Sequence, residues 1–274
     1  MSAVTATGHG VADVLARCTA EGRAALVGYL PVGFPTVEGS IRAMVAMVEA
    51  GVDIVEIGVP YSDPVMDGPV IQAAASTALA GGVRTDDVFR AAAAVRAAGA
   101  PPLVMSYWNL VLKRGVERFA SDLAAAGGAG LITPDLIPEE AADWIAASDT
   151  HGLDRVFLIA PSSTDERLTK VTSACRGFVY AAATMGVTGT RESVDSHASA
   201  LVHRARTVST VPVCVGIGVS SRAQAAEIAS WADGVIVGTA LVRCLAEHAE
   251  LSDGIAALRS LTAELAAGVR EGDR

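Results

Sequence analysis

The stretch VDIVEIGVPYSDPVMDGP at residues 52–69 joins an apolar run to a proline-rich loop. A strand that is buried on both faces of a parallel sheet reads as such a run of Val and Ile. Glu56 lies inside this run, and a buried carboxylate is costly unless it is protonated or finds partners. Glu56 is therefore either structural and paired with a buried arginine, or it takes part in chemistry.

Seven further β-rich runs alternate with helix-like segments, a pattern that is typical of repeated βα units and a parallel sheet. The eight expected strands are residues 24–32, 52–58, 102–107, 130–133, 155–160, 177–182, 211–217 and 234–238. The helices expected between them are residues 37–50, 86–98, 116–126, 138–150, 165–175, 194–208 and 222–231. Two more are expected at 11–21, covering the bottom of the sheet, and at 251–267, closing the ring.

This number of strands and helices predicts a single-domain (β/α)8 TIM barrel over residues 1–274, with its core at about 12–267. The expected fold has an extra N-terminal helix and a short phosphate-binding helix after the eighth strand. A doubly wound open sheet is the alternative. It is disfavoured because no G-x-G-x-x-G motif follows the first strand.

Composition excludes several classes of partner. The net charge of −9 disfavours nucleic acid and anionic membrane surfaces, both of which need a basic face. No apolar stretch has the length of a membrane span, and residues 1–10 do not resemble a signal peptide, so a cytoplasmic location is expected. The four cysteines have no zinc-site or disulfide spacing, and buried reduced thiols are expected.

The ends of the predicted strands carry the candidate chemistry. Glu56 shares a face with Val52 and Ile54, which points it into the barrel near the mouth, where desolvation would raise its pKa into the range of a general acid or base. Asp63 and Asp67 lie on the following loop, where either could act in the site or simply form a turn.

Three glycine-bearing segments follow the last three predicted strands and together predict a phosphate site. They are MGVTGT at 185–190, GIGVSS at 216–221 and VGTALV at 237–242. Backbone N–H groups and helix dipoles at these places favour an anion. Both lysines, Lys113 and Lys170, belong to predicted helices or precede them, and no His or carboxylate cluster is evident. Neither a Schiff-base nor a metal-dependent aldolase is therefore expected, and any carbon–carbon cleavage would use carboxylate acid/base catalysis.

Four motifs resemble those of the tryptophan synthase α subunit family, in the same order and at matching spacings. They are EIGVPYSDPVMDGPVIQ at 56–72, GVTG at 186–189, GIGVSS at 216–221 and VGTALV at 237–242. GYLPVGFPT at 28–36 and SYWNLV at 106–111 also fit, and the likeness covers about residues 12–267. Tyr61, Trp108 and Thr239 depart from residues that are common in the family.

The resemblance implies a carbon–carbon lyase that cleaves indole-3-glycerol phosphate to indole and glyceraldehyde 3-phosphate in tryptophan biosynthesis. It implies no cofactor in this chain and an αββα complex whose β subunit carries pyridoxal phosphate. Glu56 would be the general acid/base, Asp67 would hold the indole N–H, and Thr188 would close a lid by bonding to Asp67. The implied substrate-binding residues are Tyr180, Tyr29, Leu131, Ile159 and Ile217, and the implied phosphate-binding residues are Gly189, Gly218, Gly238 and Thr239.

Two rival functions are weighed against this one. Another phosphate-binding barrel, an indole-glycerol phosphate synthase or a ribulose-phosphate epimerase, would need a lysine or metal-binding histidines at strand ends. A non-catalytic regulatory barrel would bind the ligand without turnover, and the presence of both Glu56 and Asp67 disfavours it.

Overall fold

The structure is a computed structural model that describes residues 10–182 and 196–272. Its strands are β1 (Ala25–Pro31), β2 (Ile54–Gly58), β3 (Pro102–Met105), β4 (Gly130–Ile132), β5 (Asp154–Val156), β6 (Leu158–Ile159), β7 (Val179–Ala182), β8 (Val213–Gly216) and β9 (Gly234–Val237). They form one sheet in the order β5-β4-β3-β2-β1-β9-β8-β7-β6, and every strand pair in it is parallel.

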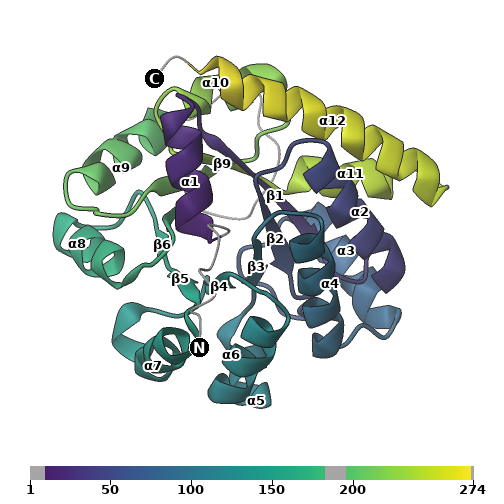
Figure 1. Cartoon of the computed structure of the whole chain (residues 1–274), viewed down its shortest axis with the longest axis horizontal. Helices are drawn as coiled ribbons and strands as arrows, with labels where there is room; N and C mark the ends of the chain where they lie inside the picture. The colour runs from purple at the N-terminus through teal and green to yellow at the C-terminus, as the bar shows by residue number, and fades with distance from the viewer. Residues whose placement is uncertain (1–9, 183–195, 273–274) are drawn as a thin grey trace, which may run out of the picture.

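Helices surround the sheet and alternate with its strands along the chain, as Figure 1 shows. They are α1 (Val11–Ala20), α2 (Val37–Glu49), α3 (Pro69–Ala80), α4 (Thr85–Ala97), α5 (Trp108–Arg114), α6 (Val116–Ala125), the 3-10 helix η1 (Pro138–Glu140), α7 (Ala142–His151), α8 (Asp165–Ala174), α9 (Ser196–Arg206), α10 (Arg222–Ala229), α11 (Thr239–Ala246) and α12 (Leu251–Glu271). The predicted (β/α)8 barrel is confirmed.

The fifth predicted strand, residues 155–160, is in fact two short strands separated by Phe157. β5 pairs only with β4 and β6 pairs only with β7, so the two ends of the sheet are consecutive in the chain and the ring closes at Phe157. The Phe157 carbonyl also accepts the N–H of Tyr180, at 3.1 Å. The barrel therefore has eight strand positions, one of which is bent and shared between its two neighbours.

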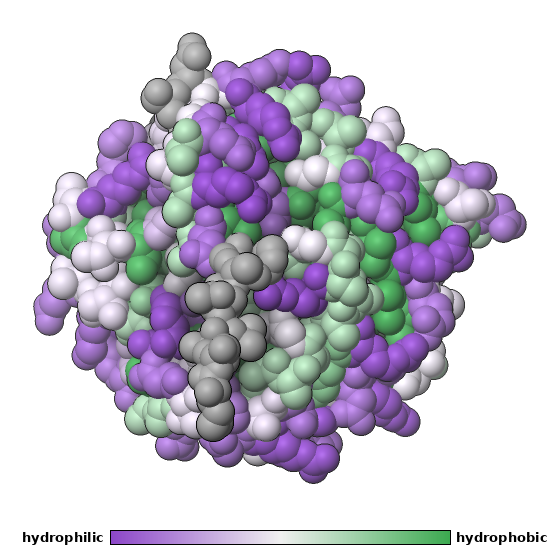
Figure 2. All heavy atoms as spheres, in the orientation of Figure 1, coloured by the Kyte–Doolittle hydropathy of each residue, from purple (hydrophilic) through white to green (hydrophobic). Residues whose placement is uncertain are grey.

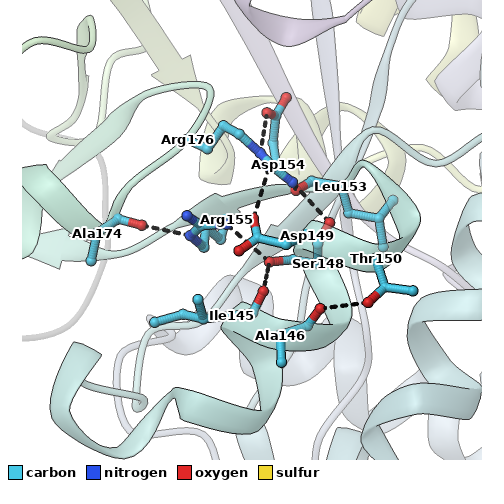
Figure 3. Close-up of polar contacts among 10 residues, drawn as sticks. All are labelled: Ile145, Ala146, Ser148, Asp149, Thr150, Leu153, Asp154, Arg155, Ala174 and Arg176. Carbon is cyan, nitrogen blue, oxygen red and sulfur yellow. Dashed lines mark hydrogen bonds and ion pairs between the residues drawn. The ribbon is translucent and has the colours of Figure 1, made fainter.

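A cluster of charged side chains fixes the start of β5, where its neighbour in the ring is an irregular segment (Figure 3). Arg155 and Arg176 form an isolated antiparallel bridge, and a guanidinium nitrogen of each lies within 3.0 Å of the carboxylate of Asp149, at 2.6 and 3.0 Å. Arg176 also lies 3.7 Å from Asp154. The bridge and these ion pairs connect β5 to the segment that precedes β7, and the parallel pairing of β6 with β7 begins directly after them.

The N-terminal helix closes one end of the barrel, as predicted, and Figure 1 shows α1 crossing in front of the strands. Its buried residues Val11, Val14, Leu15 and Cys18 belong to the same apolar cluster as the inward-facing strand residues. Those strand residues include Val27, Ile54, Leu103, Ile132, Val156 and Cys214. The core inside the barrel is therefore sealed at the N-terminal ends of the strands, and the free end is the one where the strands finish.

A second and larger apolar cluster joins strand residues to the surrounding helices, and it also includes Tyr29 and Ile217. The visible face is hydrophilic around most of its edge, with hydrophobic side chains between α2 and α12 (Figure 2). Helices α3 and α5 were not among the helices predicted from the sequence, and the single helix predicted at 138–150 is η1 and α7 in the structure. In the part of the chain that the structure describes, no helix combines the length and apolarity needed to cross a membrane.

Candidate active site

Glu56 points into the barrel from the middle of β2. It pairs in register with Tyr29 on β1 and with Leu103 on β3, and Leu103 belongs to the inner core. The side chain is 1% exposed. Its Oε2 atom has no hydrogen-bond partner among the described residues, and no arginine pairs with it there. The structural ion pair considered for Glu56 is therefore absent from residues 10–182 and 196–272.

Burial governs the protonation of Glu56. Loss of water on burial and, to a smaller extent, the negative charge of Asp67 together raise the pKa of its carboxyl from 4.5 to about 8. The carboxyl is thus mostly protonated at neutral pH and can donate a proton to a bound molecule. A buried acid of this kind is suited to proton transfer, because its pKa lies near the operating pH.

Asp67 supplies the second carboxylate from the loop between β2 and α3. Burial raises its pKa from 3.8 to about 6, so it is mostly ionised at neutral pH. Its charge raises the pKa values of Glu56 and of two tyrosines, which places it close to them. Asp63, four residues earlier, is exposed and accepts a hydrogen bond from the Ser62 hydroxyl. Of the two loop aspartates, Asp67 is the one that the structure brings to Glu56.

Tyr29 and Tyr180 lie near this carboxylate pair. The pKa of each phenol is raised, first by burial and then by the charges of the nearby carboxylates. Each ring lies against a glycine of the next strand. A Cβ atom on Gly58 would lie 2.3 Å from the Tyr29 hydroxyl, and one on Gly216 would lie 2.4 Å from the Tyr180 hydroxyl. The glycines therefore leave the space that the two rings fill.

The proposed phosphate site is partly within the described residues. Gly218 has a φ of +82°, which a residue with a side chain adopts only under strain. Gly238 precedes α11, and a Cβ atom there would lie 3.2 Å from the Tyr29 ring. Thr239 is the first residue of α11 and is 6% exposed. Gly189 and Thr188 lie outside the described residues.

Two residues expected in the indole slot face the wrong way. Leu131 pairs in register with Val104 and Ile159 with Ala181, and none of these four side chains belongs to the core inside the barrel. Their neighbours Ile132 and Leu158 belong to the inner core or pack against it, because side chains alternate between the faces of a strand. The assignment was therefore out of phase by one residue on β4 and β6. Ile217 follows β8 directly and is 6% exposed.

Sequence reasoning also missed Tyr107, which was quoted within SYWNLV without a role. Its phenol oxygen accepts the backbone N–H groups of Val65 and Met66, at 3.0 and 3.1 Å, in the loop that carries Asp67. A tyrosine as the last residue of a predicted strand was the available signal. The described residues contain no group of three or more His, Cys, Asp or Glu that could hold a metal ion.

Two carboxylates at the open end of a (β/α)8 barrel, beside tyrosines and the start of a short helix, define an acid/base site of the kind that barrel enzymes build where their strands finish. The family model described as tryptophan synthase alpha chain matches residues 15–270, so the chain belongs to the tryptophan synthase alpha chain family. This family catalyses the cleavage of indole-3-glycerol phosphate in tryptophan biosynthesis.

Individual relatives agree with this assignment. The tryptophan synthase alpha chain of Nocardia farcinica is 63% identical over 260 residues, which cover 95% of this chain and 96% of the relative. A structure of Mycobacterium tuberculosis tryptophan synthase matches with a TM-score of 0.90 at 59% identity, over 95% of this chain and 98% of that one. The alpha subunit from Legionella pneumophila matches with a TM-score of 0.86 at 30% identity, over 94% and 97% of the two chains.

Proposed function

We propose that Glu56 is the general acid/base of the cleavage and that Asp67 holds the indole N–H. The protonated Glu56 carboxyl donates its proton to C3 of the indole ring, which turns the ring into a cationic, indolenine-like tautomer. The ionised Asp67 stabilises that cation through the ring N–H. The Glu56 carboxylate then takes the proton of the glycerol hydroxyl next to the ring. As the carbon–carbon bond breaks, its electron pair returns to the ring, and indole and an aldehyde leave with Glu56 protonated again.

The observation that supports this proposal is the difference between the two carboxyl groups. Their pKa values are about 8 for Glu56 and about 6 for Asp67, so at neutral pH one is an acid and the other is an anion. Two titratable groups whose environments push their pKa values apart are the usual basis for separate acid and electrostatic roles. No metal ion or Schiff base is needed for these steps.

Binding is proposed to use the phosphate and the ring of the substrate separately. The backbone around Gly218 and Gly238, with Thr239 at the start of α11, would hold the phosphate, because helix N-termini and open backbone N–H groups attract anions. Gly189 would complete this set. Tyr29 and Tyr180 would contact the indole ring together with Ile217, and Ile132 and Leu158 would replace Leu131 and Ile159 in that role.

We also propose an αββα complex with a tryptophan synthase β subunit, which would hold the pyridoxal phosphate. Two of the similar solved structures are of tryptophan synthase from M. tuberculosis. Three large hydrophobic side chains are exposed on the segments that follow adjacent strands: Val65 (74%), Leu112 (53%) and Ile137 (42%). They suit a protein partner at this rim. The family resemblance implies that Thr188 closes the loop by bonding to Asp67, and we retain this as part of the proposal.

The test of the catalytic assignment is the Glu56→Gln variant, assayed for indole release from indole-3-glycerol phosphate. The amide keeps the shape of the side chain but cannot exchange the proton, and removal of a general acid/base costs about 10²- to 10⁴-fold in rate. Glu227→Gln, the same change on an exposed carboxylate of α10, is the matched control. Near-full activity of Glu56→Gln would contradict the assignment, and a wild-type chain that binds the substrate without releasing indole would favour the regulatory alternative.

A further inference from the structure

Tyr107 occupies a junction between the third barrel strand and the loop that carries Asp67. It lies two residues after β3, immediately before α5, and is 5% exposed. Its hydroxyl reaches across to the neighbouring loop and accepts two consecutive backbone N–H groups, of Val65 at 3.0 Å and Met66 at 3.1 Å. The second of these amides belongs to the residue directly before Asp67.

Other hydrogen bonds hold the two ends of this loop. At one end, the Val59 N–H donates to the Met105 carbonyl at 2.9 Å. At the other end, the Gln72 side chain donates to the Asp67 carbonyl at 2.8 Å. Between them, Val65 is 74% exposed. The Tyr61 ring stacks on the Tyr107 ring, with centroids 4.9 Å apart and planes at 29°.

The position of Tyr107 is itself fixed from the next strand. The N–H of Trp108, at the following residue, donates to both carboxylate oxygens of Asp135, at 2.9 and 3.1 Å. Asp135 lies in the segment after β4. Asp135 therefore anchors the backbone directly after Tyr107, and Tyr107 in turn accepts the amide that precedes Asp67.

We propose that Tyr107 is a positioning residue of the cleavage reaction, which holds the Asp67 carboxylate at its working distance from the ring N–H through the amides of Val65 and Met66. The inference rests on the proposed role of Asp67. Tyr107 acts through that residue and does not exchange a proton with the substrate. Burial raises the pKa of its phenol, so the hydroxyl is neutral at working pH.

The experiment is the Tyr107→Phe variant, which keeps the stacked ring and removes the acceptor of both amides. Each net hydrogen bond of this kind corresponds to a factor of roughly two to ten, so kcat for indole release should fall about tenfold or more. KM should change much less, because the phosphate contacts are untouched. In an Asp67→Asn background the same change should have little further effect, since a positioning residue has nothing left to position.

Two further variants separate positioning from general loss of structure. Ser209→Ala removes another hydroxyl that accepts a backbone N–H, that of Val211 at 3.2 Å, ahead of β8, and should leave kcat within about twofold of wild type. Asp135→Asn weakens the anchor of the backbone directly after Tyr107. It should lower kcat less than Tyr107→Phe, and again only where Asp67 is intact, which keeps the test decisive should Tyr107→Phe not fold.

The outcomes distinguish this inference from the proposed function. If Asp67→Asn lowers kcat but the effects of Tyr107→Phe and Asp67→Asn simply multiply, the positioning role is wrong while the role of Asp67 stands. An unchanged kcat in Tyr107→Phe, or a change confined to KM, is equally contrary to it. If Asp67→Asn itself is fully active, the proposed role of Asp67 fails, and the inference fails with it.

Discussion

Replacing Glu56 with glutamine should change the stability of the protein in a way that depends on pH. Burial, with the charge of Asp67, raises the pKa of Glu56 from 4.5 to about 8 on folding. Below pH 4.5 the carboxyl is protonated in both the folded and the unfolded chain, and no charge is buried. Between pH 4.5 and 8 the unfolded chain is ionised while the folded chain keeps its proton, so the free energy of unfolding falls as pH rises.

The size of the effect follows from the width of that pH window. Each pKa unit corresponds to about 1.4 kcal/mol. With folded and unfolded pKa values of about 8 and 4.5, Glu56 lowers the free energy of unfolding by about 3 kcal/mol at pH 7 and by about 5 kcal/mol above pH 8. Glutamine removes this loss. Its buried amide can leave a polar group without a partner, at about 1–3 kcal/mol, but that cost does not vary with pH.

The assay is urea denaturation of the wild-type chain and the Glu56→Gln variant at several values between pH 5 and pH 8. The difference in free energy of unfolding, variant minus wild type, should increase by about 1.4 kcal/mol for each pH unit. Glu227→Gln, which alters an exposed carboxylate, should show a difference that does not change with pH. A constant difference for Glu56→Gln as well would show that Glu56 is ionised in the folded protein, and the acid role would lose its basis.

Two further predictions concern other parts of the molecule. Gly238→Val should raise KM for indole-3-glycerol phosphate severalfold or more, because a Cβ atom would lie 3.2 Å from the Tyr29 ring and crowd the start of α11; steady-state kinetics with an unchanged KM would place the phosphate elsewhere. Arg23→Gln should lower the free energy of unfolding by about 3–5 kcal/mol, since it leaves the buried Asp53 carboxylate without the guanidinium that binds both its oxygens at 2.8 and 2.9 Å. In the same urea titration, Arg90→Gln, which breaks an exposed ion pair, should cost no more than about 1 kcal/mol, and equal losses for the two variants would contradict this account.

The sequence predicted the barrel and its carboxylate pair because both depend on strong local signals. Apolar runs alternating with helical segments specify repeated βα units, and Glu56 is the one charge in an apolar strand, so its inward direction and its raised pKa follow from its surroundings. Asp67 required the family resemblance, since Asp63 in the same loop is an equally good turn residue by its chemistry. The structure separates the two by exposure.

The details that the sequence could not supply have a common physical origin. Strands of a barrel are apolar on both faces, so Leu131 and Ile132, or Leu158 and Ile159, carry no alternation that tells the inward residue from the outward one. The break at Phe157 is likewise invisible within an unbroken apolar run. The role of Tyr107 depends on a hydrogen bond to backbone groups forty residues away, and backbone N–H groups have no sequence signature.

The closure of the barrel at Phe157 makes the register of its two halves sensitive to chain length. Pairing with β4 decides which side chains of β5 face inward, and pairing with β7 decides this for β6. One residue connects the two strands. An extra residue at this point would have to bulge out of the sheet, or else slip one of the two ladders by one residue and so exchange its inward and outward side chains. We therefore expect insertions to be tolerated less here than in the helical connections, and an insertion scan along residues 154–160 should find the lowest tolerance at Phe157.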